Sequence, residues 1–189
     1  MTMIQAFRFA KEREPALRLY IMGPWEEEED YAKECFELIR IMNIPDIEFT
    51  GKVDVREYHG QLDVMLLTSI SEGQPLTILE SFAARKPVVA TDVGNCKGLI
   101  MGESDDFGEA GILVPVMDVA EISMALLRLV HNEADRARMG ESGYKRVTSF
   151  YRAGAMYDSY RELYKELGPE DSNQEGKEGT EEWRELALS

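Results

Sequence analysis

The sequence has few of the residues that build disulfide frameworks or metal centres. Its 189 residues include two cysteines, Cys35 and Cys96, and two histidines. The two cysteines have no metal-ligand spacing, which leaves either one disulfide or two thiols. We expect two structural thiols in a reducing compartment, because disulfides persist in oxidising ones. His59 and His131 have no partner pattern for a catalytic triad or a zinc site, and we interpret both as structural or exposed.

Long apolar runs and positive charge are also scarce. No run approaches the roughly 20 apolar residues that a membrane span needs, and the N-terminal stretch MTMIQAFRFAKERE lacks the apolar core of a signal peptide. Lys and Arg number 21 against 36 Asp and Glu, which gives a net charge of −15. Because phosphate binding relies on basic surfaces, this balance excludes nucleic acid and anionic membranes as partners. We expect a cytoplasmic protein with no direct membrane insertion.

What the sequence does contain is an orderly alternation of helical and strand-like segments. The run from Val64 to Leu67 is wholly apolar, which is typical of a strand buried on both faces of a parallel sheet. Asp118 is placed to cap a helix over 119–131. The alternation predicts an α/β fold, with a Rossmann-like, mostly parallel sheet flanked by helices. The expected strands lie at 18–22, 46–51, 63–69, 87–93 and 111–116, and the last two helices at about 135–147 and 152–167.

Composition divides the chain into a domain over residues 1–167 and a tail over residues 168–189. The tail has seven acidic residues against Lys177 and Arg184, and we expect it to be disordered, although TEEWRELAL could form a frayed helix. The domain opens inside a helix, whereas a doubly wound sheet normally begins with a strand. We therefore expect a chain cut from a longer protein. Its sheet should have a gap or an exposed edge, which favours poor solubility or dimerisation.

The stretch SEGQPLTILES carries the chemistry. It follows a predicted strand, and Pro75 suits the first position of the next helix, where no N–H is needed. Free backbone N–H groups at that helix start form an anion site suited to a diphosphate. Glu72 and Glu80 flank it, and carboxylates accept hydrogen bonds from vicinal diols. The pattern fits a sugar nucleotide, with a ribose at one end and a hexose at the other. The same two residues could instead be a solvated loop acid and an acid offsetting the helix dipole.

The wider order of segments decides between these readings. From Arg18 to Leu167 the chain resembles the donor-binding, C-terminal half of retaining glycosyltransferases of family 4, which have the GT-B fold. The resemblance is carried by the E-x7-E motif EGQPLTILE, by SFAARKPVVATDVG after it, by IEFTGKV before it and by GILVPVMD later. The EGQPL wording looks most like the PelF-type transferases of exopolysaccharide assembly. The first strand of the domain and the whole N-terminal domain of that fold are absent from the sequence.

The resemblance implies a role for each residue of the motif. Glu72 would act as the catalytic carboxylate that binds donor-sugar hydroxyls, and Glu80 would hold the ribose. Lys52 and Val53 would lie against the nucleobase, which we expect to be uracil. Gly73, Gln74 and Pro75 would line the sugar, and Leu76 and Thr77 would offer N–H groups to the diphosphate. The resemblance implies transfer with retention and no metal or other cofactor, since charges and hydrogen bonds stabilise the departing diphosphate.

Two departures from the family pattern limit the expected activity. The family places an Arg and a Lys on the diphosphate, and neither Arg8 nor Lys11 occupies the matching position. Relatives commonly have a glutamate where Gly98 stands. We therefore expect the chain alone to be inactive, with the glycan acceptor bound by a missing N-terminal domain or a partner chain. The alternatives are a non-catalytic nucleotide-sugar-binding subunit and a degenerate interaction protein.

Overall fold

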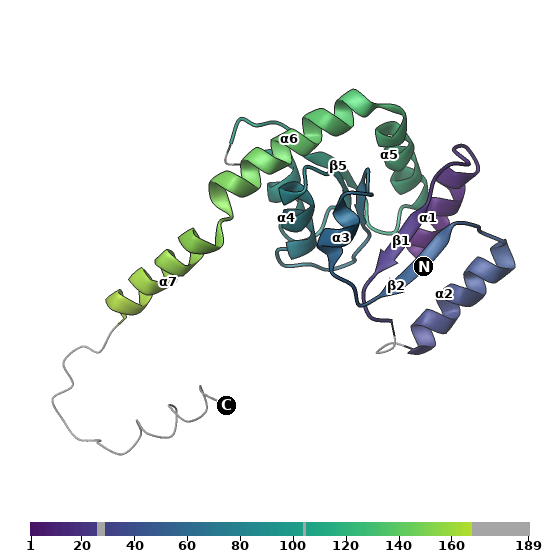
Figure 1. The fold of residues 1–189 in the computed structure, drawn as a ribbon, viewed down its shortest axis with the longest axis horizontal. Coiled ribbons are helices and arrows are strands. Elements are labelled where there is room, and N and C mark those ends of the chain that lie inside the picture. Colours follow the sequence, from purple (N-terminus) through teal and green to yellow (C-terminus); the bar gives the residue numbers. More distant parts are fainter. Residues whose placement is uncertain (26–28, 104, 168–189) are drawn as a thin grey trace, which may run out of the picture. The chain divides into compact units, whose positions relative to one another are not determined.

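The computed structural model describes residues 1–25, 29–103 and 105–167, and it has an α/β arrangement (Figure 1). The chain divides into two compact units, Met1–Arg152 and Ala153–Ser189. The predicted acidic tail lies outside the described residues. Strands and helices of the first unit alternate as the sequence predicts. They are α1 (Thr2–Lys11), β1 (Leu19–Met22), α2 (Glu29–Met42), β2 (Ile47–Gly51), α3 (Val55–His59), β3 (Met65–Leu67), α4 (Leu76–Ala83), β4 (Val88–Thr91), β5 (Gly111–Val114), α5 (Val119–His131) and α6 (Glu133–Phe150).

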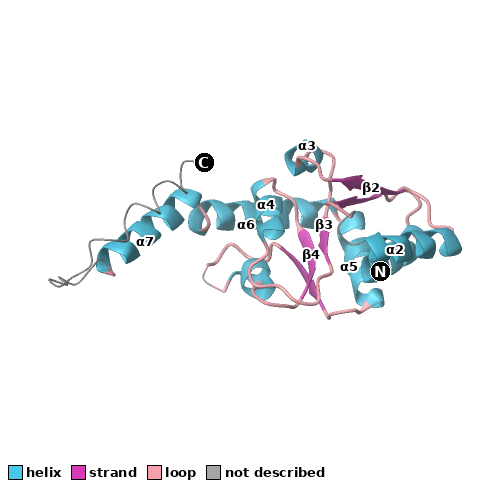
Figure 2. Cartoon of the chain, turned by 90° about the horizontal axis from the view of Figure 1, so that it is seen from below, coloured by secondary structure: helices cyan, strands magenta, loops and turns pink. Residues whose placement is uncertain are grey.

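The strands form two parallel sheets, with the orders β1–β2 and β3–β4–β5. In the larger sheet Met65, Val88 and Gly111 lie level with one another. The fold class predicted from the alternation is confirmed, because every described strand pairs in parallel and helices flank the sheets (Figure 2). The expected gap is also confirmed: among the described residues no ladder joins β1 to β3.

The core is built around β4, whose four residues are all buried. Successive side chains of a strand point to opposite faces, and β4 supplies one cluster on each. Val89 packs in a cluster with side chains of α1 and α5. Val88 and Ala90 pack on the other face, in a cluster with Ile78 and Phe82 of α4. The strand that precedes the Gly94 turn is therefore the most firmly held part of the sheet.

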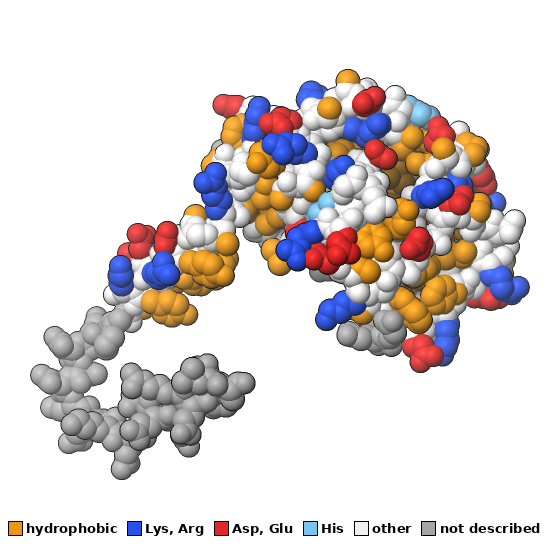
Figure 3. Space-filling view, in the orientation of Figure 1, with side chains coloured by type: hydrophobic (Ala, Val, Ile, Leu, Met, Phe, Trp, Pro, Cys, Tyr) orange, Lys and Arg blue, Asp and Glu red, His pale blue; other side chains and the backbone are white. Residues whose placement is uncertain are grey.

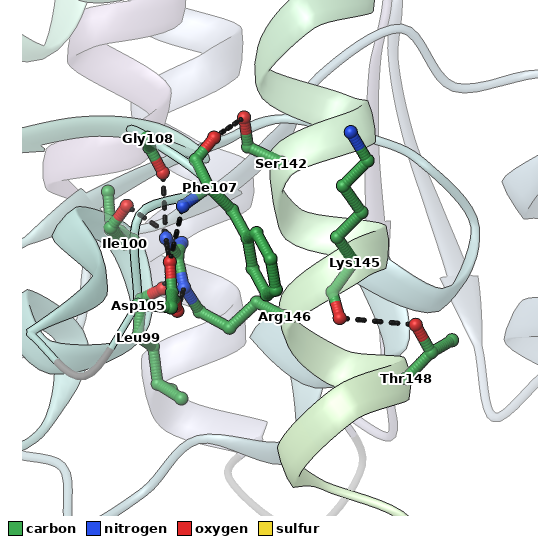
Figure 4. A network of polar contacts seen from close by, with 9 residues as sticks. All are labelled: Leu99, Ile100, Asp105, Phe107, Gly108, Ser142, Lys145, Arg146 and Thr148. Atoms are coloured by element: carbon green, nitrogen blue, oxygen red, sulfur yellow. Dashed lines mark hydrogen bonds and ion pairs between the residues drawn. The ribbon is translucent and has the colours of Figure 1, made fainter.

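A buried arginine fastens the segment between β4 and β5 to α6 (Figure 4). The Arg146 guanidinium donates to both carboxylate oxygens of Asp105, at 2.7 and 2.8 Å. It also donates to the carbonyl oxygens of Leu99, Ile100 and Gly108. Only 2% of the Arg146 side chain and 4% of the Asp105 side chain are exposed. The arginine thus holds a π-helical segment that the sequence did not predict, η2 (Gly98–Gly102).

The prediction that β3 is buried on both faces holds only in part: its side chains pack against core clusters on both faces but stay partly exposed. All three of its residues are half-buried, as are the four residues of β1. Both strands have a sheet neighbour on one side only among the described residues. The apolar run was recognised correctly, but burial of a strand also requires a covered edge, which the sequence pattern does not report.

The described part of the second unit is α7 (Ala153–Glu166) and Leu167. None of its residues is buried. Tyr157, Tyr160 and Tyr164 are 57%, 54% and 71% exposed. Tyr151, before α7, is half-buried and packs beside the cluster of Ile78 and Phe82.

Cys35 and Cys96 are both free and buried, as expected of structural thiols. Burial, together with the negative charges of Glu72 and Asp92, raises the pKa of the Cys96 thiol. That thiol stays protonated and unreactive, because the thiolate is the nucleophile. No helix in the described part of the chain is long and apolar enough to cross a membrane.

Candidate functional site

The E-x7-E stretch folds as a turn followed by α4, as predicted. Pro75 is not the first helical residue but the N-cap, with ψ of 118°. The correction follows from the extended backbone at Pro75, whose carbonyl accepts from the Ile78 N–H at 3.2 Å. No side chain caps the helix. The N–H groups of Leu76 and Thr77 are therefore the free donors of the first turn. The Leu76 side chain is 69% exposed, so it leaves this helix start open.

A second turn, after β4, fixes the shape of the first. The Asn95 N–H donates to the Gly73 carbonyl at 2.8 Å. Gly94 has φ of +52°, and a Cβ there would lie 2.0 Å from the Glu72 carbonyl oxygen. The Thr91 hydroxyl donates to the Ser69 carbonyl at 2.6 Å. The backbone that presents Glu72 is thus held by β4, and Gly94 and Asn95 join the candidate site.

The sequence offered only a weak sign of that contact. The glycine of TDVGN follows a buried strand, as Glu72 follows β3, and the carboxyl ends of neighbouring parallel strands meet at one edge. Nothing in the spacing reports that the two turns touch. Gly98 lies close to Asn95 of the second turn. A Cβ at Gly98 would lie 2.4 Å from the Asn95 Oδ1 atom, so a side chain there requires Asn95 to move.

Two cavities meet at Glu80. One, of about 650 Å³, is lined by Thr77 and Glu80 together with β1 and β3. The other, of about 550 Å³, is lined by Glu80, Val53 and α3. The structure therefore brings together the residues predicted to hold the ribose and the nucleobase, except that Lys52 lines neither cavity. Glu72, Gly73, Gln74, Pro75 and Leu76 lie outside both, on the turn at the helix start.

His59 is a further candidate that the sequence did not single out. It lines both cavities. Its Nε2 atom is buried and has no hydrogen-bond partner in the described part of the chain. A buried polar atom without a partner is costly, so a bound group with a donor or acceptor would stabilise this arrangement. We expected a structural or exposed histidine, and this one is half-buried.

Three cations near these cavities, Arg56, Arg136 and Lys11, are already engaged. Arg56 forms an ion pair with Asp54, and this contact lowers the pKa of the Asp54 carboxyl to about 2. Arg136 donates to the carbonyl oxygens of Leu129 and Val130. Lys11 bonds the Asp46 carboxylate and the carbonyl oxygens of Pro15 and Leu17. At the start of α4, the N–H groups of Leu76 and Thr77 are placed to bind an anion. The described residues contain no group of three His, Cys, Asp or Glu that could hold a metal ion.

The fold of this chain is also found in solved structures of other proteins. The C-terminal domain of the Francisella tularensis glycosyl transferase group 1 family protein LpcC aligns with a TM-score of 0.70 and 24% identity, over 80% of this chain and 78% of that one. Anabaena Alr3699/HepE, solved in complex with UDP and glucose, aligns with a TM-score of 0.76 and 19% identity, over 86% of this chain and 44% of that one.

Sequence comparison gives the family. The Rhizobium meliloti (strain 1021) lipopolysaccharide core biosynthesis glycosyltransferase LpsE is 26% identical over 80% of this chain and 42% of its own length. The chain spans less than half the length of the curated relatives that it matches. The family model described as "Glycosyl transferases group 1" matches residues 1–132. With the parallel α/β fold and the E-x7-E turn, this match shows that the chain belongs to the group 1 glycosyltransferases, as a C-terminal GT-B domain.

Proposed function

We propose that the chain is the donor-binding domain of a cytoplasmic, family 4 retaining glycosyltransferase of the PelF type, acting in exopolysaccharide synthesis. In the complete enzyme it would present a UDP-sugar to a glycan acceptor. The observation that carries this proposal is the placement of Glu72 and Glu80 on either side of the uncapped start of α4. UDP in the similar HepE structure supports the choice of nucleotide.

The proposed donor lies along the carboxyl ends of the strands, beside α3 and the start of α4. Uracil and ribose occupy the smaller cavity, with Val53 as an apolar wall and Glu80 accepting from the ribose hydroxyls. The diphosphate meets the Leu76 and Thr77 N–H groups, where the helix dipole favours negative charge. The hexose lies over the turn of Gly73, Gln74 and Pro75, beside Glu72. Lys52, exposed next to Val53, would contact the base from outside.

The chemistry proposed for this domain is electrostatic. When the bond between the sugar and the diphosphate breaks, negative charge develops on the leaving phosphate, and N–H groups already aimed at it stabilise that charge. Glu72 fixes the sugar ring by its hydroxyls and so orients the reacting carbon. We propose that no metal takes part. The acceptor is a glycan hydroxyl, whose oxygen bonds the sugar carbon on the face that the diphosphate leaves and whose proton passes to the departing diphosphate.

Calorimetry with UDP and UDP-glucose tests the two carboxylates separately. A hydrogen bond to a charged group is worth about 1.5–3 kcal/mol. The Glu80→Gln variant should therefore bind both ligands about ten- to a hundredfold more weakly. The Glu72→Gln variant should bind UDP-glucose more weakly by a similar factor and UDP unchanged, since UDP has no hexose.

The matched control is Glu121→Gln, an exposed glutamate in the first turn of α5. It should leave both affinities unchanged. Absence of heat with either ligand at millimolar concentration would refute nucleotide-sugar binding. Binding of UDP with no difference between Glu72→Gln and the wild type would instead favour a nucleotide-binding subunit without a sugar site.

A further inference from the structure

The smaller of the two cavities, of about 550 Å³, lies between α3 and the second half of α4. We call it the α3–α4 cavity. Residues 53–56 and His59 line it on the α3 side, and Glu80, Ala83 and Ala84 line it on the α4 side. Residues three and four apart on a helix share a face, so both alanines lie on the face of Glu80. Their short side chains leave room for a ligand between the two helices.

The short helix α3 is held at both of its ends. The Asp54 side chain caps its start by accepting from the Arg56 N–H at 3.0 Å. Near its end, the Tyr58 ring packs edge-on against the Tyr20 ring of β1, with ring centroids 5.8 Å apart. The last residue of the helix is His59. The cap and the aromatic contact therefore keep His59 at the wall of the α3–α4 cavity.

The polar side chains around the α3–α4 cavity differ in what they already bind. Opposite charges lie next to one another over α3 (Figure 3). The Arg56 Nε atom donates to both carboxylate oxygens of Asp54, at 2.8 and 3.0 Å, so this pair satisfies itself. The His59 Nε2 atom is buried without a partner, and the Glu80 side chain forms no hydrogen bond or ion pair with the described residues. A ligand between the helices can bind both of these groups.

An imidazole and a carboxylate together complement a vicinal diol better than a carboxylate does alone. Each hydroxyl has one hydrogen to donate and two lone pairs that accept. The Glu80 carboxylate only accepts, so it leaves the lone pairs of a bound diol unused. An Nε2–H group, present in one neutral tautomer of histidine and in the protonated ring, can donate to one of those oxygens. His59 and Glu80 both line the larger cavity as well, which places them around the same space.

We propose that His59 is a specificity-determining residue of the donor site, whose Nε2–H group donates to one hydroxyl oxygen of the ribose that Glu80 holds. The proposal rests on the proposed function, in which the α3–α4 cavity takes the nucleoside of a UDP-sugar. The contact favours ribonucleotides over deoxyribonucleotides. The buried nitrogen gains this partner when the nucleotide binds, and His59 takes no part in breaking the bond to the sugar.

Calorimetry with UDP, 2′-deoxy-UDP and 3′-deoxy-UDP tests the contact. The His59→Leu variant should bind UDP about tenfold more weakly, as expected for the loss of one hydrogen bond. With the deoxynucleotide that lacks the contacted hydroxyl, this variant and the wild type should bind equally. The His59→Gln variant keeps a donor at the end of its side chain and should retain most of the UDP affinity. The matched control is His131→Leu, at the exposed histidine of α5, which should leave all three affinities unchanged.

The melting temperature without ligand distinguishes this role from a structural one. A buried polar atom without a partner destabilises the fold. The ligand-free His59→Leu variant should therefore melt at the same temperature as the wild type or higher. Added UDP should raise its melting temperature by less than that of the wild type, because the variant binds UDP more weakly.

The proposal is overturned by any of three results. One is an unchanged UDP affinity in His59→Leu. Another is an equal loss with all three nucleotides, which would place the contact on the base or the phosphates. The third is a lower melting temperature of the ligand-free variant, which would assign His59 to the packing of α3. Weaker UDP binding by Glu80→Gln with no change in His59→Leu would leave the proposed function standing, whereas no binding of UDP to the wild type at millimolar concentration would refute both.

Discussion

The Asp105→Ala variant should lose about 3–5 kcal/mol of unfolding free energy, because it leaves the charged Arg146 side chain buried without a counter-ion. Three carbonyl oxygens still accept from the guanidinium, but none of them carries a full negative charge. Denaturant unfolding followed by circular dichroism measures the difference. The matched control is Glu37→Ala, which removes an exposed partner from Arg40. Exposed pairs contribute about 0–1 kcal/mol, so a similar loss in both variants would contradict the expectation.

The same ion pair should make this difference depend on pH. The Arg146 guanidinium holds the pKa of the Asp105 carboxyl below its usual range. A carboxyl with a lowered pKa in the folded state stabilises that state fully above its unfolded pKa, about 3.9. The contribution is lost as the pH falls from there through the folded value. The gap between the wild type and Asp105→Ala should therefore be constant near neutral pH and shrink below about pH 4.

Local features were predictable from the sequence because each depends on neighbours along the chain. The alternation of apolar periods gave the order of strands and helices, and Asp118 caps α5 by accepting from the Glu121 N–H, as predicted. The pairing of Asp105 with Arg146 spans 41 residues, and no spacing rule reports a contact of that range. The half-burial of β3 was not predicted for a related reason. A run of apolar residues indicates that a strand suits a buried position, but it does not indicate whether a neighbouring strand covers its edge.

The candidate site shows the same division. The E-x7-E spacing placed Glu72 before the α4 start and Glu80 within the helix, since both positions follow from one turn and the helical pitch. The contact of Gly94 with the Glu72 carbonyl, and the position of His59 beside both cavities, arise from packing between segments distant in sequence. The helix start is therefore a local property of the motif, whereas the orientation of Glu72 depends on β4.

Because the orientation of Glu72 depends on the turn after β4, we expect a second large effect from a substitution at Gly94. A Cβ at this residue would lie 2.0 Å from the Glu72 carbonyl oxygen and 2.7 Å from the Gly73 carbonyl oxygen. Both are backbone atoms, so the two turns must move apart. The left-handed φ of +52° adds about 1–3 kcal/mol of strain for a residue with a side chain. The Gly94→Ala variant should melt at a lower temperature and lose binding of UDP-glucose, as measured by calorimetry.

The Gly73→Ala variant distinguishes an effect on ligand binding from an effect on stability. Nothing lies within 4 Å of a Cβ at Gly73. Its melting temperature should therefore stay the same or rise. Alanine lowers the conformational entropy of the unfolded chain, which stabilises the folded state by about 0.4–1 kcal/mol. If the hexose lies against this backbone, the added methyl group should still weaken UDP-glucose binding and leave UDP binding unchanged. Unchanged UDP-glucose affinity in Gly73→Ala would mean that the donor sugar does not contact this turn, and that Gly94 acts on stability alone.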